Sequence, residues 1–101
     1  MNNARRKELK NLIGQLGRIQ DEGDLYACIN DLEDIKYEEE CSYDNIPENL
    51  QSSQRASESE EAIDNLEDAL NLLNEVYDMD EIDLDSELIQ EAIDKIESAC
   101  W

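Results

Sequence analysis

Carboxylates are the side chains of this sequence that could do chemistry, and they are numerous. The 101 residues include 28 Asp and Glu, eight Lys and Arg, and no His. Almost any two of these carboxylates could be drawn as an acid–base pair, so such a pairing carries no information. No imidazole can act as a base or ligand, and no Ser or Cys has a recognisable activating partner. We therefore expect a protein that is not an enzyme and that uses no cofactor.

An acidic segment around residue 80 is the candidate that most resembles a metal site. Its carboxylates belong to Asp78, Asp80, Asp83, Asp85 and Glu87. An EF-hand loop needs oxygen ligands at positions one, three and five, Gly at six and Glu at twelve. Counted from the first of these acids, positions five, six and twelve are Ile82, Asp83 and Ile89. The pattern fails, so we expect an acidic linker between helices and no metal site.

The three cysteines, Cys28, Cys41 and Cys100, form no CxxC pair. Without such a pair and without His, a zinc site is not expected. The N-terminus has no apolar stretch of the kind found in secretory signals, which favours a cytoplasmic chain with reduced thiols. Cys28 and Cys100 fall on apolar stripes and are expected in the core, whereas Cys41 is expected to be the exposed thiol.

Charge is distributed very unevenly along the chain. Residues 1–18 carry five bases and one acid, whereas residues 19–101 carry 27 acids and three bases. The field of the acidic part repels nucleic acid and anionic membranes and attracts basic surfaces. We therefore expect no direct nucleic-acid binding and no membrane association. The basic N-terminus is expected to dock on acidic helices, so that charge is complemented between protomers or between the first helix and the last.

Apolar spacing predicts helices and no strands. Steps of three and four residues place apolar side chains on one face throughout residues 3–40. Gly23 weakens a helix by about 1 kcal/mol relative to Ala. Either one long helix runs to about residue 40, or two helices meet near residue 23. We favour a long helix that is bent or interrupted there.

Turn-forming residues fill the expected loop at 41–56, where Pro47 predicts a short turn through Leu50. A second helix is predicted at 57–77, with Ser57 and Glu60 as a capping box. A last helix is predicted at 86–100, with Asp85 or Ser86 as its cap. The expected architecture is one all-α domain over residues 1–101: a small bundle of three to four helices with a long N-terminal helical arm or hairpin.

Acids on the 57–77 helix have a spacing that suggests phosphate mimicry. The seven acids of this helix stand roughly 4.5 Å apart along its axis. Duplex DNA carries a charge about every 1.7 Å, a density that two adjacent acidic helices approach. We therefore predict a surface that binds a basic partner. Its candidate residues are Glu60, Glu61, Asp64, Glu67 and Asp68, with Glu38, Glu39 and Glu40 as a second cluster.

The middle third of the chain resembles a pattern found in short acidic proteins of Gram-positive phages and mobile elements. The similar segment is YDNIPENLQSSQRASESEEAIDNLEDAL, residues 43–70. Its most specific part is YDNIPENL, residues 43–50, followed by Ser53 and the helix start at residues 61–63. That group assigns no catalytic or binding residues, but small acidic phage proteins are often inhibitors of host defence, including anti-CRISPR and anti-restriction proteins.

Together, the charge and the resemblance imply a non-enzymatic inhibitor acting in the cytoplasm of a bacterial host cell. It would bind the basic nucleic-acid-binding surface of a defence nuclease, with a CRISPR effector as the leading candidate. The alternative is a structural, oligomerising accessory protein whose apolar stripes pair between chains as a homodimer. Under that hypothesis the acidity only keeps the protein in solution.

Overall fold

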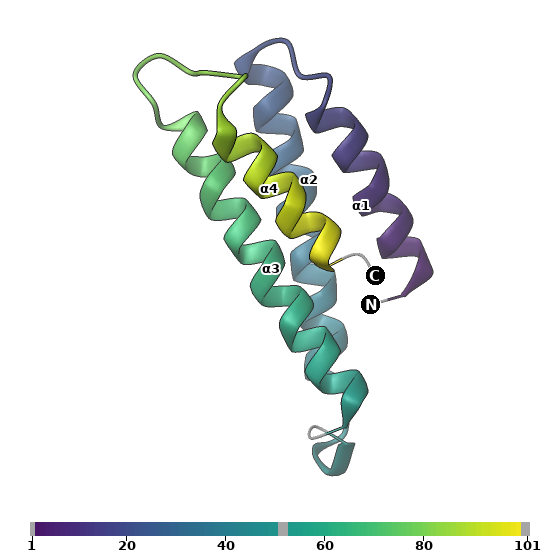
Figure 1. Cartoon of the computed structure of the whole chain (residues 1–101). Coiled ribbons are helices and arrows are strands. Elements are labelled where there is room, and N and C mark those ends of the chain that lie inside the picture. Colours follow the sequence, from purple (N-terminus) through teal and green to yellow (C-terminus); the bar gives the residue numbers. More distant parts are fainter. Residues whose placement is uncertain (1, 51–52, 100–101) are drawn as a thin grey trace.

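The computed structural model describes residues 2–50 and 53–99, and four α-helices account for most of them (Figure 1). They are α1 (Asn3–Leu16), α2 (Glu22–Asp44), α3 (Gln54–Tyr77) and α4 (Glu87–Ala99). A single 3-10 turn, η1 (Glu48–Leu50), lies between α2 and α3, and no strand occurs in either described segment. The predicted all-α bundle is confirmed.

Consecutive helices run antiparallel, and each packs on two neighbours (Figure 1). α1 contacts α2 and α4, and α3 contacts the same two helices from the other corner of the bundle. With a rise of about 1.5 Å per residue, α2 and α3 are several turns longer than α1 and α4. The longer pair therefore extends beyond the shorter pair at the end that carries η1, which gives principal extents of 48 × 22 × 18 Å.

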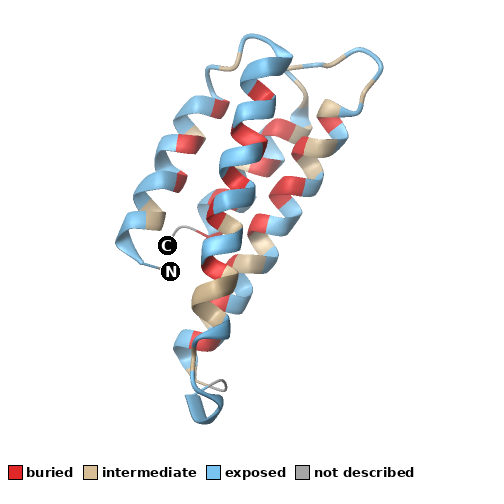
Figure 2. Ribbon diagram, turned by 180° about the vertical axis from the view of Figure 1, so that it is seen from behind, coloured by how far each residue is buried: buried red, intermediate tan, exposed pale blue. Residues whose placement is uncertain are grey.

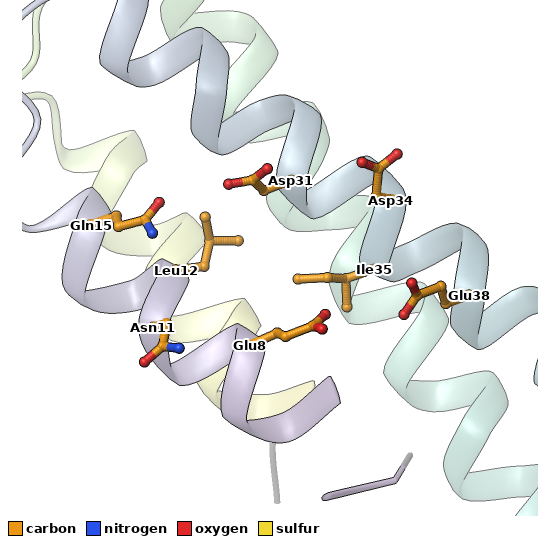
Figure 3. Close-up of a pocket in the computed structure, with 8 residues that line it drawn as sticks. All are labelled: Glu8, Asn11, Leu12, Gln15, Asp31, Asp34, Ile35 and Glu38. Atoms are coloured by element: carbon orange, nitrogen blue, oxygen red, sulfur yellow. The ribbon is translucent and has the colours of Figure 1, made fainter. Parts of the chain in front are cut away.

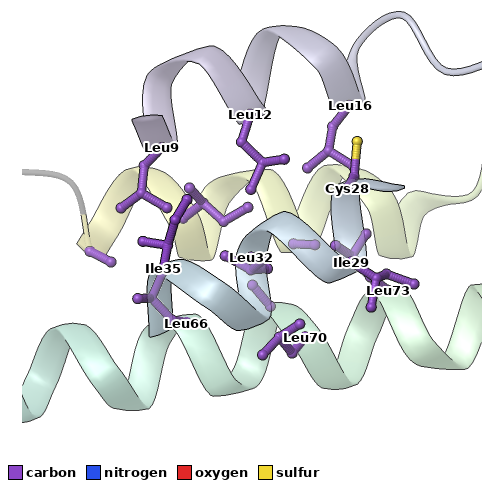
Figure 4. Close-up of a cluster of buried hydrophobic side chains, with 14 of the residues drawn as sticks. Leu9, Leu12, Leu16, Cys28, Ile29, Leu32, Ile35, Leu66, Leu70 and Leu73 are labelled. Carbon is purple, nitrogen blue, oxygen red and sulfur yellow. The ribbon is translucent and has the colours of Figure 1, made fainter. Parts of the chain in front are cut away.

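Each helix turns its predicted apolar stripe towards the centre of the bundle (Figures 2 and 4). The spacing of three and four residues puts these side chains on one face, where burial removes them from water. Cys28 lies among them, 2% exposed, as its position on a stripe predicts. The core consists of Leu9, Leu12, Leu16, Leu25, Cys28, Ile29, Leu32, Ile35, Ala62, Leu66, Ala69, Leu70, Leu73, Val76, Ile89, Ala92, Ile96 and Ala99.

The N-terminal arm is a hairpin of two separate helices, not one long bent helix. α1 ends at Leu16, residues 17–21 turn the chain, and Asp21 caps the start of α2. The Asp21 side chain accepts the amide of Asp24 at 2.8 Å, and the Asp24 carboxylate accepts the amide of Gln20 at 3.0 Å. The first bond satisfies an amide that a helix start leaves unpaired, and the second holds the residue before the cap against the first turn of α2. Gly23 therefore lies inside the first turn of α2, not at the break.

Two other helix boundaries also differ from the prediction. α2 continues to Asp44, so Cys41 lies within a helix and is only partly exposed. α3 begins at Gln54, because the Ser53 hydroxyl accepts the amide of Ala56 at 3.3 Å and acts as the cap. Ser57, the predicted cap, lies inside the helix.

The remaining turn predictions agree with the structure. Leu50 donates its amide to the Pro47 carbonyl at 2.8 Å, which closes the predicted turn. Ser86 accepts the amide of Leu88 at 3.2 Å and caps α4, as one of the two predicted residues. The predicted helix end at residue 100, and with it the expected burial of Cys100, lies outside the described residues.

Candidate partner-binding surface

The five acids predicted on α3 form an exposed stripe on its outer face. Because the steps between them are one, three and four residues, they project from the side of α3 opposite its buried residues. Asp68 lies 3.7 Å from the ammonium of Lys95 on α4, and the other four acids form no ion pair within the described residues. This stripe, hereafter the α3 stripe, consists of Glu60, Glu61, Asp64, Glu67 and Asp68, all exposed.

The second predicted cluster, Glu38, Glu39 and Glu40, does not exist as a cluster. Consecutive helical residues point about 100° apart, so the three carboxylates leave α2 in different directions. Glu38 is exposed beside α1, whereas Glu40 is half-exposed and forms an ion pair with Lys36 one turn away. Glu39 is 1% exposed. Only Glu38 therefore remains an exposed carboxylate without an ion pair.

Glu39 points into the protein and joins three helices. One carboxylate oxygen, Oε2, accepts Nε of Arg5 on α1 at 2.9 Å. The other, Oε1, accepts the hydroxyl of Ser59 on α3 at 2.7 Å. A buried charge requires such partners, because water no longer stabilises it. Glu39 is therefore excluded from a partner-binding surface. Arg5 does dock on an acidic helix of its own chain, but this helix is α2 and not the last helix, which the sequence had indicated.

A groove between α1 and α2 gathers four carboxylates that the sequence analysis did not single out as a group (Figure 3). It has a volume of about 350 Å³ and a floor formed by Leu12 and Ile35. Figure 3 shows that Glu8 and Glu38 extend towards each other from the two helices. The carboxylates of this α1/α2 groove belong to Glu8, Asp31, Asp34 and Glu38.

The only signal in the sequence for this groove is the spacing of Asp31, Asp34 and Glu38. Steps of three and four residues place them on one face of α2. Glu8 joins them from α1 because the two helices form a hairpin, a contact that the spacing on α2 does not reveal.

A further acidic groove of about 420 Å³ lies between α3 and α4. Asp68 of the α3 stripe lines it, together with Glu75 of α3 and with Glu91 and Asp94 of α4. Since α1 and α2 occupy the other two corners of the bundle, carboxylates surround much of the molecule. The acidic surface therefore extends around the bundle and is not one flat patch.

The local field of these carboxylates is visible at Lys36. Its hydrogen bond to Glu40 raises the pKa of the Lys36 ammonium above its usual value. The nearby charges of Glu67 and Glu33 act in the same direction. A guanidinium or ammonium group brought to this surface by a partner would experience the same attraction.

The residues that the structure describes include no group of three or more His, Cys, Asp or Glu side chains arranged to hold a metal ion. In the same part of the chain, no helix combines the length and the apolar character needed to cross a bilayer. Comparisons with known proteins found no matching family, no similar curated protein and no similar solved structure.

Proposed function

We propose that this protein is a non-enzymatic inhibitor, encoded by a phage or mobile element, that binds the basic nucleic-acid-binding surface of a host defence nuclease. A CRISPR effector is the leading target class. The mechanism is occupation of a groove: carboxylates take the positions of phosphates, so that guide or target strands cannot enter. Association is fast and falls with rising salt, because opposite charges steer the encounter.

The observation that carries the proposal is the α3 stripe. Five carboxylates lie on the exposed side of one helix, and only Asp68 forms an ion pair with a cation of the described residues, although the charge of Glu67 also acts on Lys36. An ordinary acidic helix face offsets part of its charge with Lys or Arg one turn away. In α3 the only base is Arg55, which precedes the stripe. The stripe therefore presents a nearly uncompensated line of charge to a partner.

The alternative, an oligomerising accessory protein, required the apolar stripes to pair between chains. In the structure these stripes pack against one another within a single chain. The large apolar or aromatic side chains exposed among the described residues are Tyr26, Tyr37 and Leu50, which do not form a stripe. No observation of the structure therefore favours this alternative.

The proposal is tested with DNA-cleavage assays of purified CRISPR effectors and restriction nucleases from Gram-positive bacteria. The protein is added before or after the nucleic acid, at low and at high salt. We expect inhibition of at least one nuclease, strongest at low salt and when the protein is added first. The charge-reversal variant Glu60→Lys/Glu61→Lys/Asp64→Lys should abolish this inhibition.

A matched control separates the α3 stripe from net charge alone. Asp80→Lys/Glu81→Lys/Asp85→Lys changes the net charge by the same amount, using exposed residues of the connection between α3 and α4. It should inhibit nearly as well as the unmodified protein. Equal loss in both variants would show that only net charge matters. Failure to inhibit any nuclease of either class would overturn the proposal.

A further inference from the structure

Three of the eight basic residues line one hollow where the bundle narrows from four helices to two. The hollow has a volume of about 280 Å³. Arg5 and Arg6 reach it from α1, and Arg55 reaches it from α3. The hydroxyls of Ser42 and Ser59 also line it. This arginine hollow is therefore polar and rich in hydrogen-bond donors, in a chain that is acidic almost everywhere else.

Carboxylates are the minority among the charged residues that line the hollow. Glu39 and Glu58 line it, against three guanidinium groups. Among the charged residues that line the hollow, guanidinium groups thus outnumber carboxylates, whereas the chain as a whole has a net charge of −20. At physiological ionic strength, exposed charges more than about 8 Å away are largely screened. An anion that enters the hollow therefore interacts mainly with the guanidinium groups.

The arginines occupy positions where they oppose helix stability. Arg5 and Arg55 lie in the first turns of α1 and α3, at the positive ends of the helix dipoles, and Arg6 follows directly. Neither helix has an acid in its first turn, whereas α2 and α4 do. In a chain with 28 acids, arginine thus occupies the first turns of the two helices that meet at this hollow. Such a local conflict is expected where a residue serves a function.

Donor groups in the hollow are available to a ligand. Arg5 gives Nε to Glu39, and its Nη atoms form no hydrogen bond with the described residues. Because the described part of the chain contains no buried side-chain nitrogen or oxygen without a partner, these Nη atoms reach solvent. Arg55 is exposed and forms no ion pair within the described residues. A guanidinium group with free N–H donors suits the oxygens of a planar carboxylate or of a tetrahedral phosphate.

We infer that the arginine hollow is a binding site for an oxyanion group, phosphate or carboxylate, held by Arg55 and by the Nη atoms of Arg5. The site is separate from the acidic surfaces, and it stands whether or not the protein inhibits a nuclease. Its ligand is negative, the opposite of the basic partner proposed for the α3 stripe.

The test is a titration with sodium phosphate and, separately, with sodium acetate, both at constant ionic strength maintained with sodium chloride. NMR follows the Nε–Hε signals of the arginines and the amide of Ser59. We expect saturable shifts at Arg5, Arg55 and Ser59 with at least one of the two anions. The tighter of the two identifies the oxyanion.

Arg55→Gln should weaken the binding by about tenfold, because a hydrogen bond to a charged group is lost. Its thermal stability without added anion should be equal or slightly higher, because a cation leaves the positive end of α3. Arg18→Gln, at the opposite end of the bundle, is the matched control and should leave the shifts unchanged. Shifts that do not saturate with either anion, or equal weakening by both variants, would overturn the inference.

Discussion

Arg5 Nε lies 2.9 Å from Glu39 Oε2, and this contact fixes the first turn of α1 against the last turns of α2. Glu39 is 1% exposed and the Arg5 side chain 13%, so water screens the pair poorly. Ser59 holds the second carboxylate oxygen from α3. One carboxylate thus sets how three helices meet where the bundle narrows.

Removing Arg5 should therefore be costly. In Arg5→Met the Glu39 carboxylate stays buried and loses its guanidinium partner, and we expect a loss of about 3 kcal/mol in the free energy of unfolding. Urea denaturation followed by circular dichroism measures it. Lys36→Met is the matched control, because it breaks the more exposed pair with Glu40 and should cost no more than about 0.5 kcal/mol.

A double variant tests whether the cost comes from the buried carboxylate that has lost Arg5. Arg5→Met/Glu39→Leu removes both charges and should recover much of the stability lost in Arg5→Met. Ser59 then loses its acceptor, so the recovery should be incomplete. A double variant that is no more stable than Arg5→Met would contradict this explanation.

The start of α3 provides a second prediction. The Ser53 hydroxyl accepts the Ala56 amide, so Ser53→Ala should lower the free energy of unfolding by about 1 kcal/mol. Ser57 is exposed inside the same helix, and Ser57→Ala should change stability by less than about 0.5 kcal/mol. Thermal or urea unfolding of the two variants compares them directly. The opposite order would place the functional cap at Ser57.

The contrast between Ser53 and Ser57 illustrates what the sequence could predict. The apolar stripes of all four helices follow from local periodicity, which depends on each segment alone. The cap of α3 does not follow from the local pattern, because two serines stand four residues apart and only one of them can cap the helix. The break in the N-terminal arm is marked in the sequence by the capping residues Asp21 and Asp24, whereas the weak helix former Gly23 lies inside the first turn of α2.

Glu39 shows why part of the candidate surface could not be predicted. Its neighbours Glu38 and Glu40 face solvent, and nothing in the local pattern distinguishes the three. Its burial depends on Arg5 and Ser59, which are 34 and 20 residues away in the chain. By contrast, the α3 stripe was predictable, because its residues need only to avoid the apolar face of their own helix.

Cys28 provides a prediction on thiol reactivity. Burial raises the pKa of its thiol from the usual 9.0 to about 11, and the charges of Asp31 and Asp24 add to the rise. Since the thiolate is the reactive form, Cys28 should react with a disulfide reagent far more slowly in the folded than in the unfolded protein. The variant Cys41→Ser/Cys100→Ser isolates this thiol. Equal rates with and without denaturant would contradict the expectation.

The same shift predicts a dependence of stability on pH. Below pH 9 the thiol is protonated in both states, so its burial costs nothing in ionisation. Between pH 9 and about 11 the unfolded state loses the proton first, and the folded state becomes less stable. The difference in unfolding free energy between the wild type and Cys28→Ala, measured with a reducing agent, should therefore fall over this range. A constant difference would contradict it.

Salt dependence is the prediction that reflects the whole molecule. A net charge of −20 on 101 residues repels itself in the compact state, and counter-ions screen that repulsion. The melting temperature should rise by several degrees between about 20 mM and about 500 mM sodium chloride. Arg55→Gln should retain this rise, because salt screens the repulsion among carboxylates of the whole acidic surface and not only charges at the arginine hollow. Glu60→Lys/Glu61→Lys/Asp64→Lys should show a smaller rise, since it begins with less repulsion to screen. A melting temperature that falls with salt would mean that ion pairs such as Arg5–Glu39, and not repulsion, dominate the electrostatic free energy of folding.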